Sequence, residues 1–341
     1  MVQHQGLPLS LSDYARVLWA PPHAQDAADP FESTIVTGFF DLRRADWVGR
    51  EGEPSNFRRT TDEYFDWFDR LARLKNPFVV FTDPESGSRV LESRRSHGLE
   101  DRTAVVTIQG LFEAPPVANI VAEAGKRMTA QFRRWLLHPE YPEFREPRYV
   151  VLTALKPTFA NTAIELGLVN TAQLAWIDFG YCRDDQRFDP TKPWRFDAGD
   201  RMNLFHVTEL DDQPIPRVVR LGTPYMQAGH IVGPTLAWAP FAEELARALD
   251  ALLACDLVDD EQTLMLMAWR RDPSKYRLHA VSRGDWRIVF RRFNCETPLE
   301  RVRADPAPKR RDESPLMQEI RIALKRLEWR IKRWRGKLGM P

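Results

Sequence analysis

Short runs of apolar residues, many of them β-branched or aromatic, constrain the fold of this 341-residue chain more than any other feature. Segments with apolar residues at helical spacing separate several of these runs. Fully apolar short strands are typical of parallel sheets, because helices cover both faces of such a sheet. The pattern predicts strands at 33–40, 78–82, 103–108, 149–152, 173–177, 205–207, 227–232 and 286–290. We therefore expect one α/β domain with a mostly parallel central sheet.

The predicted helices fall between these strands. The clearest has apolar residues three or four positions apart, at Tyr64, Trp67, Phe68, Leu71 and Leu74. Others are expected at about 116–137, 159–166, 239–254 and 259–269. The first 33 residues show no sustained period, and we expect them to form an N-terminal extension with at most one short helix.

Composition narrows the class of protein. A hydrophobic fraction of 43% can build a core that excludes water from a reaction centre. The three cysteines, Cys182, Cys255 and Cys295, are scattered and lack metal-ligand spacing, which favours a reducing compartment. No signal peptide and no apolar run of about 18 residues is present, so we expect a cytoplasmic protein.

The C-terminal segment differs from the rest of the chain in charge. Residues 301–341 contain 13 Lys and Arg residues against 5 Asp and Glu, whereas the whole chain has a net charge of only +1. Its apolar residues alternate at spacings of three and four, which is a coiled-coil seam. These residues are Met317, Ile320, Leu324, Leu327, Ile331, Trp334 and Leu338. The sequence predicts a linker and a basic amphipathic helix over 303–341.

Two functions of this predicted helix stay open. The seam fits pairing with a second copy or docking on the domain itself. The basic flank of residues 316–338, with its tryptophans, fits contact with an anionic membrane surface. No nucleic-acid recognition motif accompanies the positive charge, so no specific nucleic-acid partner is expected.

Several standard catalytic motifs are missing: GxxxxGK[ST], GxGxxG, HExxH and GxSxG. The remaining candidates are carboxylates that follow apolar strands, namely Asp41, Asp83 and Asp178. Ligands of open α/β sheets bind beyond the carboxyl ends of the strands, where these side chains should meet. Each alone is commonly a turn or helix-capping residue. Three together favour a ligand site, and the apolar strand before Asp178 makes it the strongest candidate.

Four segments of the sequence resemble one known family. They are 34–41, the helix 64–74 leading to 78–83, Leu155-Lys156-Pro157, and Trp176-Ile177-Asp178-Phe179-Gly180-Tyr181 with Arg183. Together they are similar to the bacterial HtrL/YibB family, over roughly residues 34–300. The resemblance implies a GT-A-like (Rossmann-like) glycosyltransferase domain at 34–302. It also implies transfer of a sugar from a nucleotide sugar to a glycan or lipid-linked glycan acceptor, in surface polysaccharide or lipopolysaccharide synthesis at the inner face of the membrane.

The resemblance further implies where the donor and a metal would bind. Asp178 stands at the first position of an Asp-x-Asp motif that holds Mn²⁺ or Mg²⁺ on the donor diphosphate, and Gly180 replaces the second carboxylate. His279 is the candidate for the missing metal ligand, with Arg283 reaching the diphosphate. Lys156 is expected to reach a phosphate.

Other donor-binding residues follow from the same resemblance. Thr37, Phe39 and Asp41 lie where the base and ribose of the donor would bind. His230 and Gly233 belong to a glycine-containing segment that would pack against the donor sugar, since glycine permits close backbone approach.

The acidic start of the helix at 259–269 offers the catalytic carboxylate. Asp260 or Glu261 would take the proton of the acceptor hydroxyl or contact the donor sugar. Acids in a first helical turn are also favoured by the helix dipole alone. A catalytically silent domain that binds nucleotide or glycan and acts through its tail is the alternative to a transferase, and a nucleotidyltransferase is a weaker third reading.

Overall fold

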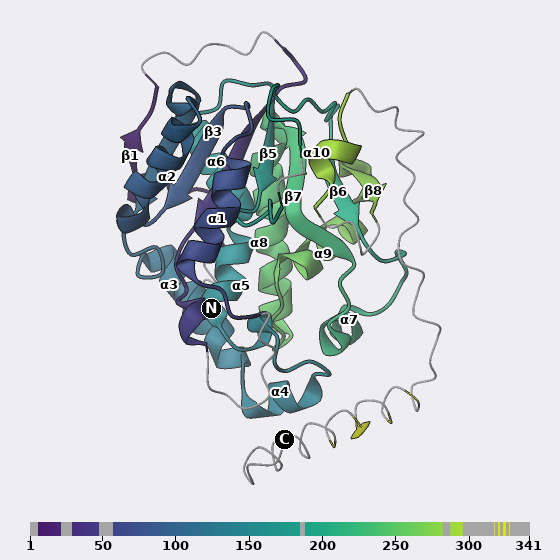
Figure 1. Ribbon diagram of the computed structural model, residues 1–341. Helices are drawn as coiled ribbons and strands as arrows, with labels where there is room; N and C mark the ends of the chain where they lie inside the picture. Colours follow the sequence, from purple (N-terminus) through teal and green to yellow (C-terminus); the bar gives the residue numbers. More distant parts are fainter. Residues whose placement is uncertain are drawn as a thin grey trace.

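The computed structural model describes residues 6–21, 29–47, 57–184, 188–281 and 287–295, together with Met317, Ile320, Ala323, Leu324 and Leu327. The domain has three layers, with one twisted sheet between two layers of helices (Figure 1). This α/β architecture confirms the predicted fold class in its coarse form.

Eight strands form the sheet in the described part of the chain, in the order β1-β4-β3-β2-β5-β7-β6-β8. They are β1 (Ala15–Trp19), β2 (Ser33–Phe39), β3 (Phe78–Thr82), β4 (Thr103–Ile108), β5 (Gln173–Ile177), β6 (Met202–His206), β7 (Met226–Pro234) and β8 (Tyr276–Ala280). The central strands β4, β3, β2 and β5 run parallel to one another. β7 is antiparallel to both β5 and β6, and β1 is antiparallel to β4. The sheet is therefore mixed, with a parallel centre.

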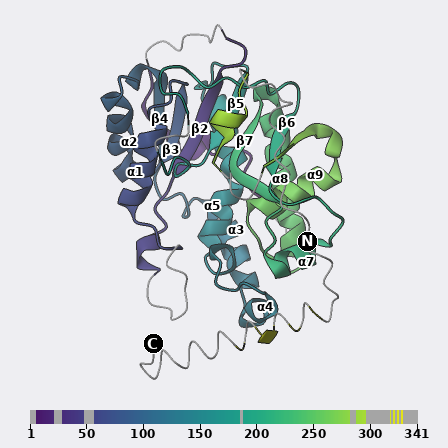
Figure 2. The same cartoon turned by 45° about the vertical axis from the view of Figure 1, so that its right-hand side comes forward.

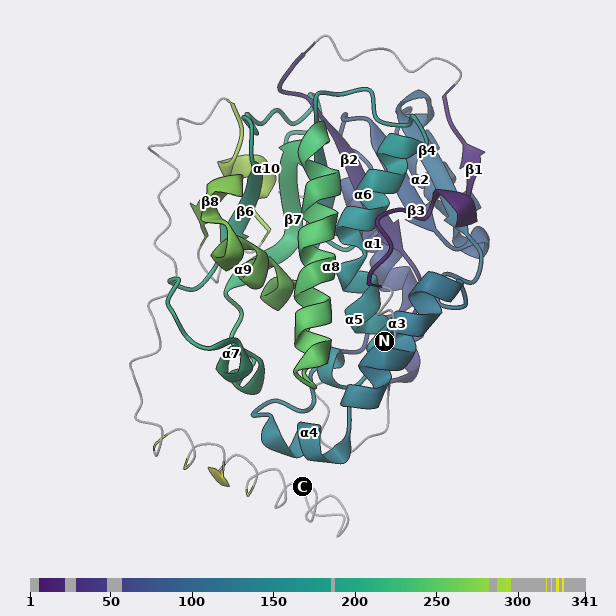
Figure 3. The same ribbon diagram turned by 180° about the vertical axis from the view of Figure 1, so that it is seen from behind.

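Helices cover both faces of this sheet. They are α1 (Thr61–Leu71), α2 (Pro84–Ser96), α3 (Pro115–Arg127), α4 (Ala130–Trp135), α5 (Pro147–Ala154), α6 (Lys156–Glu165), α7 (Ile215–Leu221), α8 (Trp238–Ala254), α9 (Glu261–Arg271) and α10 (Val289–Arg292). Helices α1 and α2 lie on one face, whereas α6 and α8 lie on the other (Figures 1 and 3). Figure 2 shows α3, α4 and α5 below the strands.

Side chains of the buried strands alternate between two cores, as the pleat of a strand requires. In β3, Phe78 and Val80 pack with the α1 side, while Val79 and Phe81 pack with the α6 and α8 side. Both sets are buried. This double burial explains why the strand sequence is continuously apolar rather than alternating.

Two of the predicted strands are wrong. Residues 149–152 belong to α5, where Pro147 occupies the first turn and the Glu146 side chain accepts a hydrogen bond from the Arg148 N–H. Val289 and Phe290 lie in the short helix α10. A short apolar run does not distinguish a strand from a buried helix, and a proline in the first turn favours the helix.

Other differences concern element boundaries and missed strands. The helix predicted at 116–137 is two helices, because Thr129 ends the first segment and caps α4 by accepting from the Phe132 N–H. β8 was not predicted. β1 lies within the predicted N-terminal extension, yet it pairs with β4 as the edge strand of the sheet.

The predicted C-terminal helix is described at five positions only. Met317, Ile320, Ala323, Leu324 and Leu327 are helical and exposed. The rest of that segment lies outside the described residues, so the basic helix stays a prediction. Within the described ranges, no helix combines the length and apolarity needed to cross a membrane.

One buried cation joins α1, α2 and the strands β3 and β4. Arg94 of α2 is fully buried. Its guanidinium donates to the carbonyl oxygens of Ala72 at 2.7 Å and Leu74 at 2.6 Å, and to that of Asn76 at 3.0 Å. It also donates to the Thr103 hydroxyl at 2.8 Å. The side chain thus supplies hydrogen-bond donors to the backbone carbonyl groups between α1 and β3, which have no partners within a helix or the sheet.

We expect Arg94→Leu to lower the free energy of unfolding by about 3 kcal/mol or more, because three buried carbonyl groups lose their donors. Urea denaturation followed by circular dichroism measures the change. Arg95→Leu, one position along on the exposed side of α2, is the matched control, because its ion pairs are solvent-screened and contribute little to stability. Equal losses in the two variants would contradict a structural role for Arg94.

Candidate functional site

The candidate site lies at the carboxyl end of β5, where one ammonium group joins two carboxylates. Lys156, the first residue of α6, places Nζ 2.7 Å from Asp178 Oδ1 and 2.7 Å from Glu261 Oε1. The same Nζ donates to the Ala228 carbonyl oxygen at 2.9 Å. Trp176 Nε1 donates to Asp178 Oδ1 at 2.8 Å. Residues from β5, β7, α6 and α9 therefore converge on Lys156.

The two carboxylates differ in exposure. The side chains of Lys156 and Glu261 are each 6% exposed, whereas that of Asp178 is 41% exposed. Although burial opposes its charge, Asp178 and Glu261 raise the pKa of Lys156 above its ordinary value. The ammonium is therefore charged throughout the physiological range. Asp178 is the most exposed member of this triad.

Three further carboxyl groups lie close to Glu261. Burial and the charges of Asp259 and Glu261 raise the pKa of Glu143 to about 8. Burial also raises the pKa of Asp259 to about 7. Burial and the charges of Glu261, Glu143 and Asp259 raise the pKa of Asp260 well above its ordinary value. At neutral pH these groups share protons, and a carboxyl group with a pKa near 7 can both accept and donate one.

Hydrogen bonds separate the roles of Asp259, Asp260 and Glu261. Asp260 is the N-cap of α9 and accepts from the Gln262 N–H at 3.0 Å. Asp259 accepts from the Thr263 hydroxyl at 2.7 Å. Glu261 Oε2 is buried and has no hydrogen-bond partner among the described residues. Buried oxygens are rarely left without a donor, so Glu261 Oε2 keeps the capacity to accept a further hydrogen bond.

Gly180 leaves space for two aromatic rings rather than for a ligand. A Cβ atom at this position would lie 2.9 Å from Trp67 Cε3 and 3.2 Å from Tyr64 Cδ1. Any side chain there, a second carboxylate included, would displace these rings of α1. The packing of α1 therefore explains why this position holds a glycine.

The predicted ribose-binding residues lie at the same edge of the sheet but outside the Lys156 network. Asp41 accepts hydrogen bonds from the Arg43 N–H at 2.7 Å and the Thr61 hydroxyl at 2.9 Å. Thr37 is fully buried within β2, and Phe39 packs against Phe179 with ring centroids 5.1 Å apart. Of these three predicted residues, Asp41 alone is exposed.

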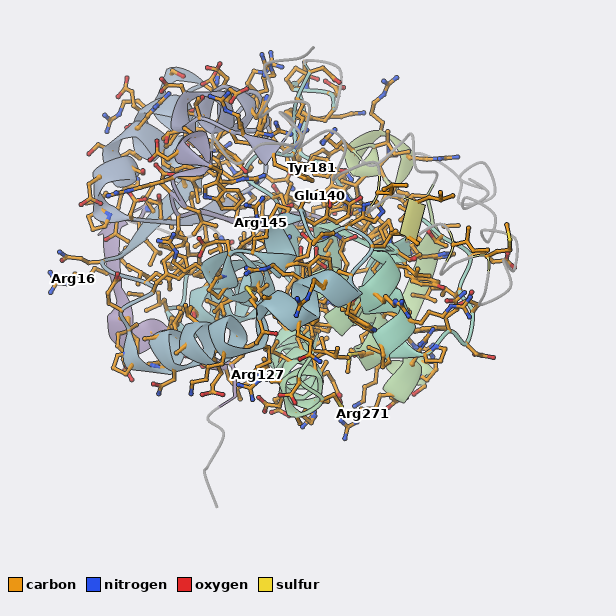
Figure 4. All side chains as sticks on the ribbon, turned by 90° about the horizontal axis from the view of Figure 1, so that it is seen from below. Arg16, Arg127, Glu140, Arg145, Tyr181 and Arg271 are labelled. Carbon is orange, nitrogen blue, oxygen red and sulfur yellow. The ribbon has the colours of Figure 1, made fainter. Side chains whose placement is uncertain are left out.

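The two predicted sugar-contacting residues lie within β7. Gly233 pairs with Leu174 at the start of β5, so it lies at the opposite end of that strand from Asp178. A Cβ atom at Gly233 would meet Met202 Sδ at 2.3 Å, so the glycine allows close packing of β6 on β7. His230 is buried against Tyr181, with ring centroids 5.5 Å apart. Figure 4 faces the carboxyl edge of the sheet from below and labels Tyr181.

The predicted metal ligand His279 is hydrogen-bonded elsewhere. Its Nε2 lies 2.8 Å from Asn203 Oδ1, and its ring stacks on Phe205. Burial and the positive charge of Arg277 lower its pKa to about 4. In the described ranges, no three His, Cys, Asp or Glu side chains come together to hold a metal ion. Arg283 lies outside the described residues.

A cavity of about 510 Å³ lies at the opposite edge of the sheet. It is lined by residues that include Leu74, Trp194, Phe290 and Asn294. Leu74 precedes β3, so this cavity is at the amino end of the parallel strands. The charged network around Lys156 is at their carboxyl end, where ligands of α/β sheets bind.

Several residues of the site were not predicted from the sequence. Glu143 lies in the short 3₁₀ helix before α5, and Tyr149 lies in α5 itself, in the part predicted as a strand. Burial and the charges of Glu143 and Glu261 raise the pKa of Tyr149 well above its ordinary value. Arg44 hydrogen-bonds to the Tyr64 hydroxyl at 2.7 Å. No local motif marks these residues, because long-range packing alone brings them together.

Comparison with known proteins supports one family. Residues 31–295 match the model of a family described as bacterial protein of unknown function (HtrL_YibB). The chain is also 31% identical over 270 residues to Protein HtrL of Escherichia coli strain K12. The matched region covers 78% of this chain and 93% of that protein.

The buried carboxyl groups predict an unusual pH dependence of stability. Glu143 has a pKa of about 8 in the folded protein and an ordinary, lower value when unfolded. The native state therefore holds a proton that the unfolded state releases, so stability falls as pH rises through this window. Between about pH 5 and pH 8.5, we expect the free energy of unfolding of the wild type to fall by about 1–3 kcal/mol more than that of Glu143→Gln. Asp212→Asn, at an exposed carboxylate, serves as the control. If the free energies of unfolding of wild type and Glu143→Gln changed in parallel with pH, Glu143 would not carry the extra proton in the folded state.

Proposed function

The chain belongs to the HtrL/YibB family, and we propose that it is a nucleotide-sugar-dependent glycosyltransferase. The observation that carries this proposal is the shared ammonium of Lys156, which joins the accessible Asp178 to the buried Glu261. An accessible carboxylate beside a buried acidic cluster suits a reaction that binds a polar donor and removes a proton. The acceptor is a glycan or lipid-linked glycan, as the family resemblance suggests.

The reaction needs one bond to form and one to break. The oxygen of an acceptor hydroxyl attacks the anomeric carbon of the donor sugar and forms the new glycosidic bond. The bond from that carbon to the phosphate oxygen breaks, and the nucleoside diphosphate leaves with the electron pair. The hydroxyl proton passes to a carboxylate, which must lie within hydrogen-bond reach.

We assign the proton-accepting role to Glu261 rather than Asp260. Glu261 Oε2 is without a hydrogen-bond partner in the described part of the chain, and Glu261 shares Lys156 with Asp178. Asp260 is occupied as the cap of α9. Lys156 holds Glu261 and Asp178 at a fixed separation, so the base and the donor-binding carboxylate keep their relative positions.

Mn²⁺ or Mg²⁺ remains a prediction of the family resemblance. Asp178 Oδ1 already accepts from Lys156 and Trp176, so Asp178 offers a metal only its second oxygen. The described residues do not supply a site of several protein ligands. No step of the proposed reaction depends on an ion.

We expect the full-length protein to hydrolyse or transfer from at least one sugar nucleotide in a screen of UDP-, GDP- and CMP-sugars, with and without Mn²⁺. Asp178→Asn should lower kcat/KM by about 100-fold or more, because the donor-binding carboxylate is lost. Asp200→Asn, at an exposed turn, should leave turnover unchanged. Binding of sugar nucleotides without any turnover would instead support the catalytically silent domain.

A matched pair of variants distinguishes the two candidate bases, Glu261 and Asp260. Glu261→Gln should lower kcat by about 100-fold or more with little change in donor affinity, because the base acts on the acceptor proton. Asp260→Asn should retain most of kcat and of the stability, because asparagine caps a helix about as well as aspartate. The opposite assignment would follow if Asp260→Asn abolished turnover while Glu261→Gln retained it.

A further inference from the structure

Three arginines converge on an aromatic pair beside Gly180. Tyr64 and Trp67 of α1 pack edge to face, with ring centroids 5.3 Å apart. The guanidinium carbon of Arg183 lies 4.5 Å from the centroid of the Trp67 ring, and that of Arg59 lies 5.5 Å from it. Arg44 donates to the Tyr64 hydroxyl at 2.7 Å. We call Arg44, Arg59 and Arg183 the arginine cluster.

No carboxylate of the described part of the chain forms an ion pair with the arginine cluster. Arg44 donates to neutral acceptors, the Tyr64 hydroxyl and the Phe57 carbonyl oxygen. Arg59 donates to the Arg58 carbonyl oxygen. Arg183 stacks on Trp67 and makes no ion pair with a described residue. Partial burial, and the positive charges of Arg287, Arg59 and Arg44, lower the pKa of Arg183 to about 10.

This arrangement is electrostatically unfavourable without an anion. Like charges held close together repel one another. Stacking of a cation on an aromatic ring offsets this repulsion by only about 0.5–2 kcal/mol. Arg183 is exposed and Arg44 and Arg59 are half-buried, yet all three contact the same aromatic pair. Stacking fixes the plane of a guanidinium and leaves its N–H groups free to donate in pairs to phosphate oxygens.

We propose that the arginine cluster binds the diphosphate of the sugar-nucleotide donor, an inference that rests on the proposed function. A diphosphate carries several negative charges and needs several cations to neutralise them. The cluster is close to Asp178 through Gly180, two residues further along the chain, where an added Cβ atom would meet Trp67 and Tyr64. The leaving phosphate would thus bind on the Trp67 side of Gly180, and the accessible Asp178 carboxylate would contact hydroxyl groups of the same donor.

The proposal divides the site into two halves of opposite charge. Arg59 and Arg183 lie on the α1 side of Gly180, and Asp259, Asp260 and Glu261 lie at the start of α9. Arg44 is close to both, because its charge lowers the pKa of Glu143 as well as that of Arg183. The basic half binds the leaving group, and the acidic half accepts the proton of the acceptor.

The test uses inorganic pyrophosphate as the probe, titrated calorimetrically into the full-length protein in EDTA at low salt. We expect binding that weakens with added salt. Arg183→Gln and Arg59→Gln should each weaken it by about tenfold or more, and Arg183→Lys should restore only part of the loss, since lysine lacks the planar fork. Arg16→Gln is the control, because Arg16 points outwards from the edge strand (Figure 4). Circular dichroism confirms that each variant is folded.

The outcomes separate this proposal from the proposed function. Pyrophosphate binding that is lost in Arg183→Gln supports the arginine cluster even if no sugar nucleotide is turned over. Turnover of a sugar nucleotide with KM unchanged in Arg183→Gln and Arg59→Gln would overturn the proposal and leave the transferase intact. A sugar monophosphate, titrated in parallel, identifies the ligand. If it binds more tightly than pyrophosphate, the cluster serves a phosphorylated acceptor and the assignment to the donor fails.

Discussion

The candidate site depends on a single buried ammonium. Lys156 lies at the junction of α6, β5, β7 and α9, and each of its three polar contacts comes from a different element. Burying this charge would be costly without partners, but two carboxylates and a carbonyl oxygen surround it. The consequence is rigidity. Asp178 and Glu261 come from distant parts of the sequence, yet a shared cation fixes them relative to each other.

The parallel centre of the sheet and its edge of carboxylates could be predicted from the sequence. Apolar runs such as Phe78–Thr82 indicate strands buried on both faces, and Asp41, Asp83 and Asp178 do follow parallel strands. What the sequence could not show is which of them have local roles. Asp83 caps α2 by accepting from the Ser86 N–H, and Asp41 accepts from the Arg43 N–H in a turn. Asp178 differs because it pairs with a buried ammonium, that of Lys156, which also binds Glu261 of α9.

The rest of the site escaped prediction for a related reason. Glu143 precedes α5, and the valines of that helix have the composition of a strand. Its proximity to Asp259 and Glu261 follows from the packing of α5 on α9 rather than from any local pattern. The antiparallel β7 was predicted as a strand, but its direction was not. That direction places Gly229 beside Asp178 and carries Gly233 to the far edge, because the Asp178 N–H donates to the Gly229 carbonyl oxygen.

Gly180 links the packing of the fold to the charge of the site. Replacing a second carboxylate with glycine removes a negative charge, and the space is filled by Trp67 and Tyr64. These rings then provide the surface on which Arg59 and Arg183 stack. A carboxylate at this position would both displace the rings and pair with the arginines. A change at one position therefore alters two properties together, and the edge beside Asp178 becomes positive instead of negative.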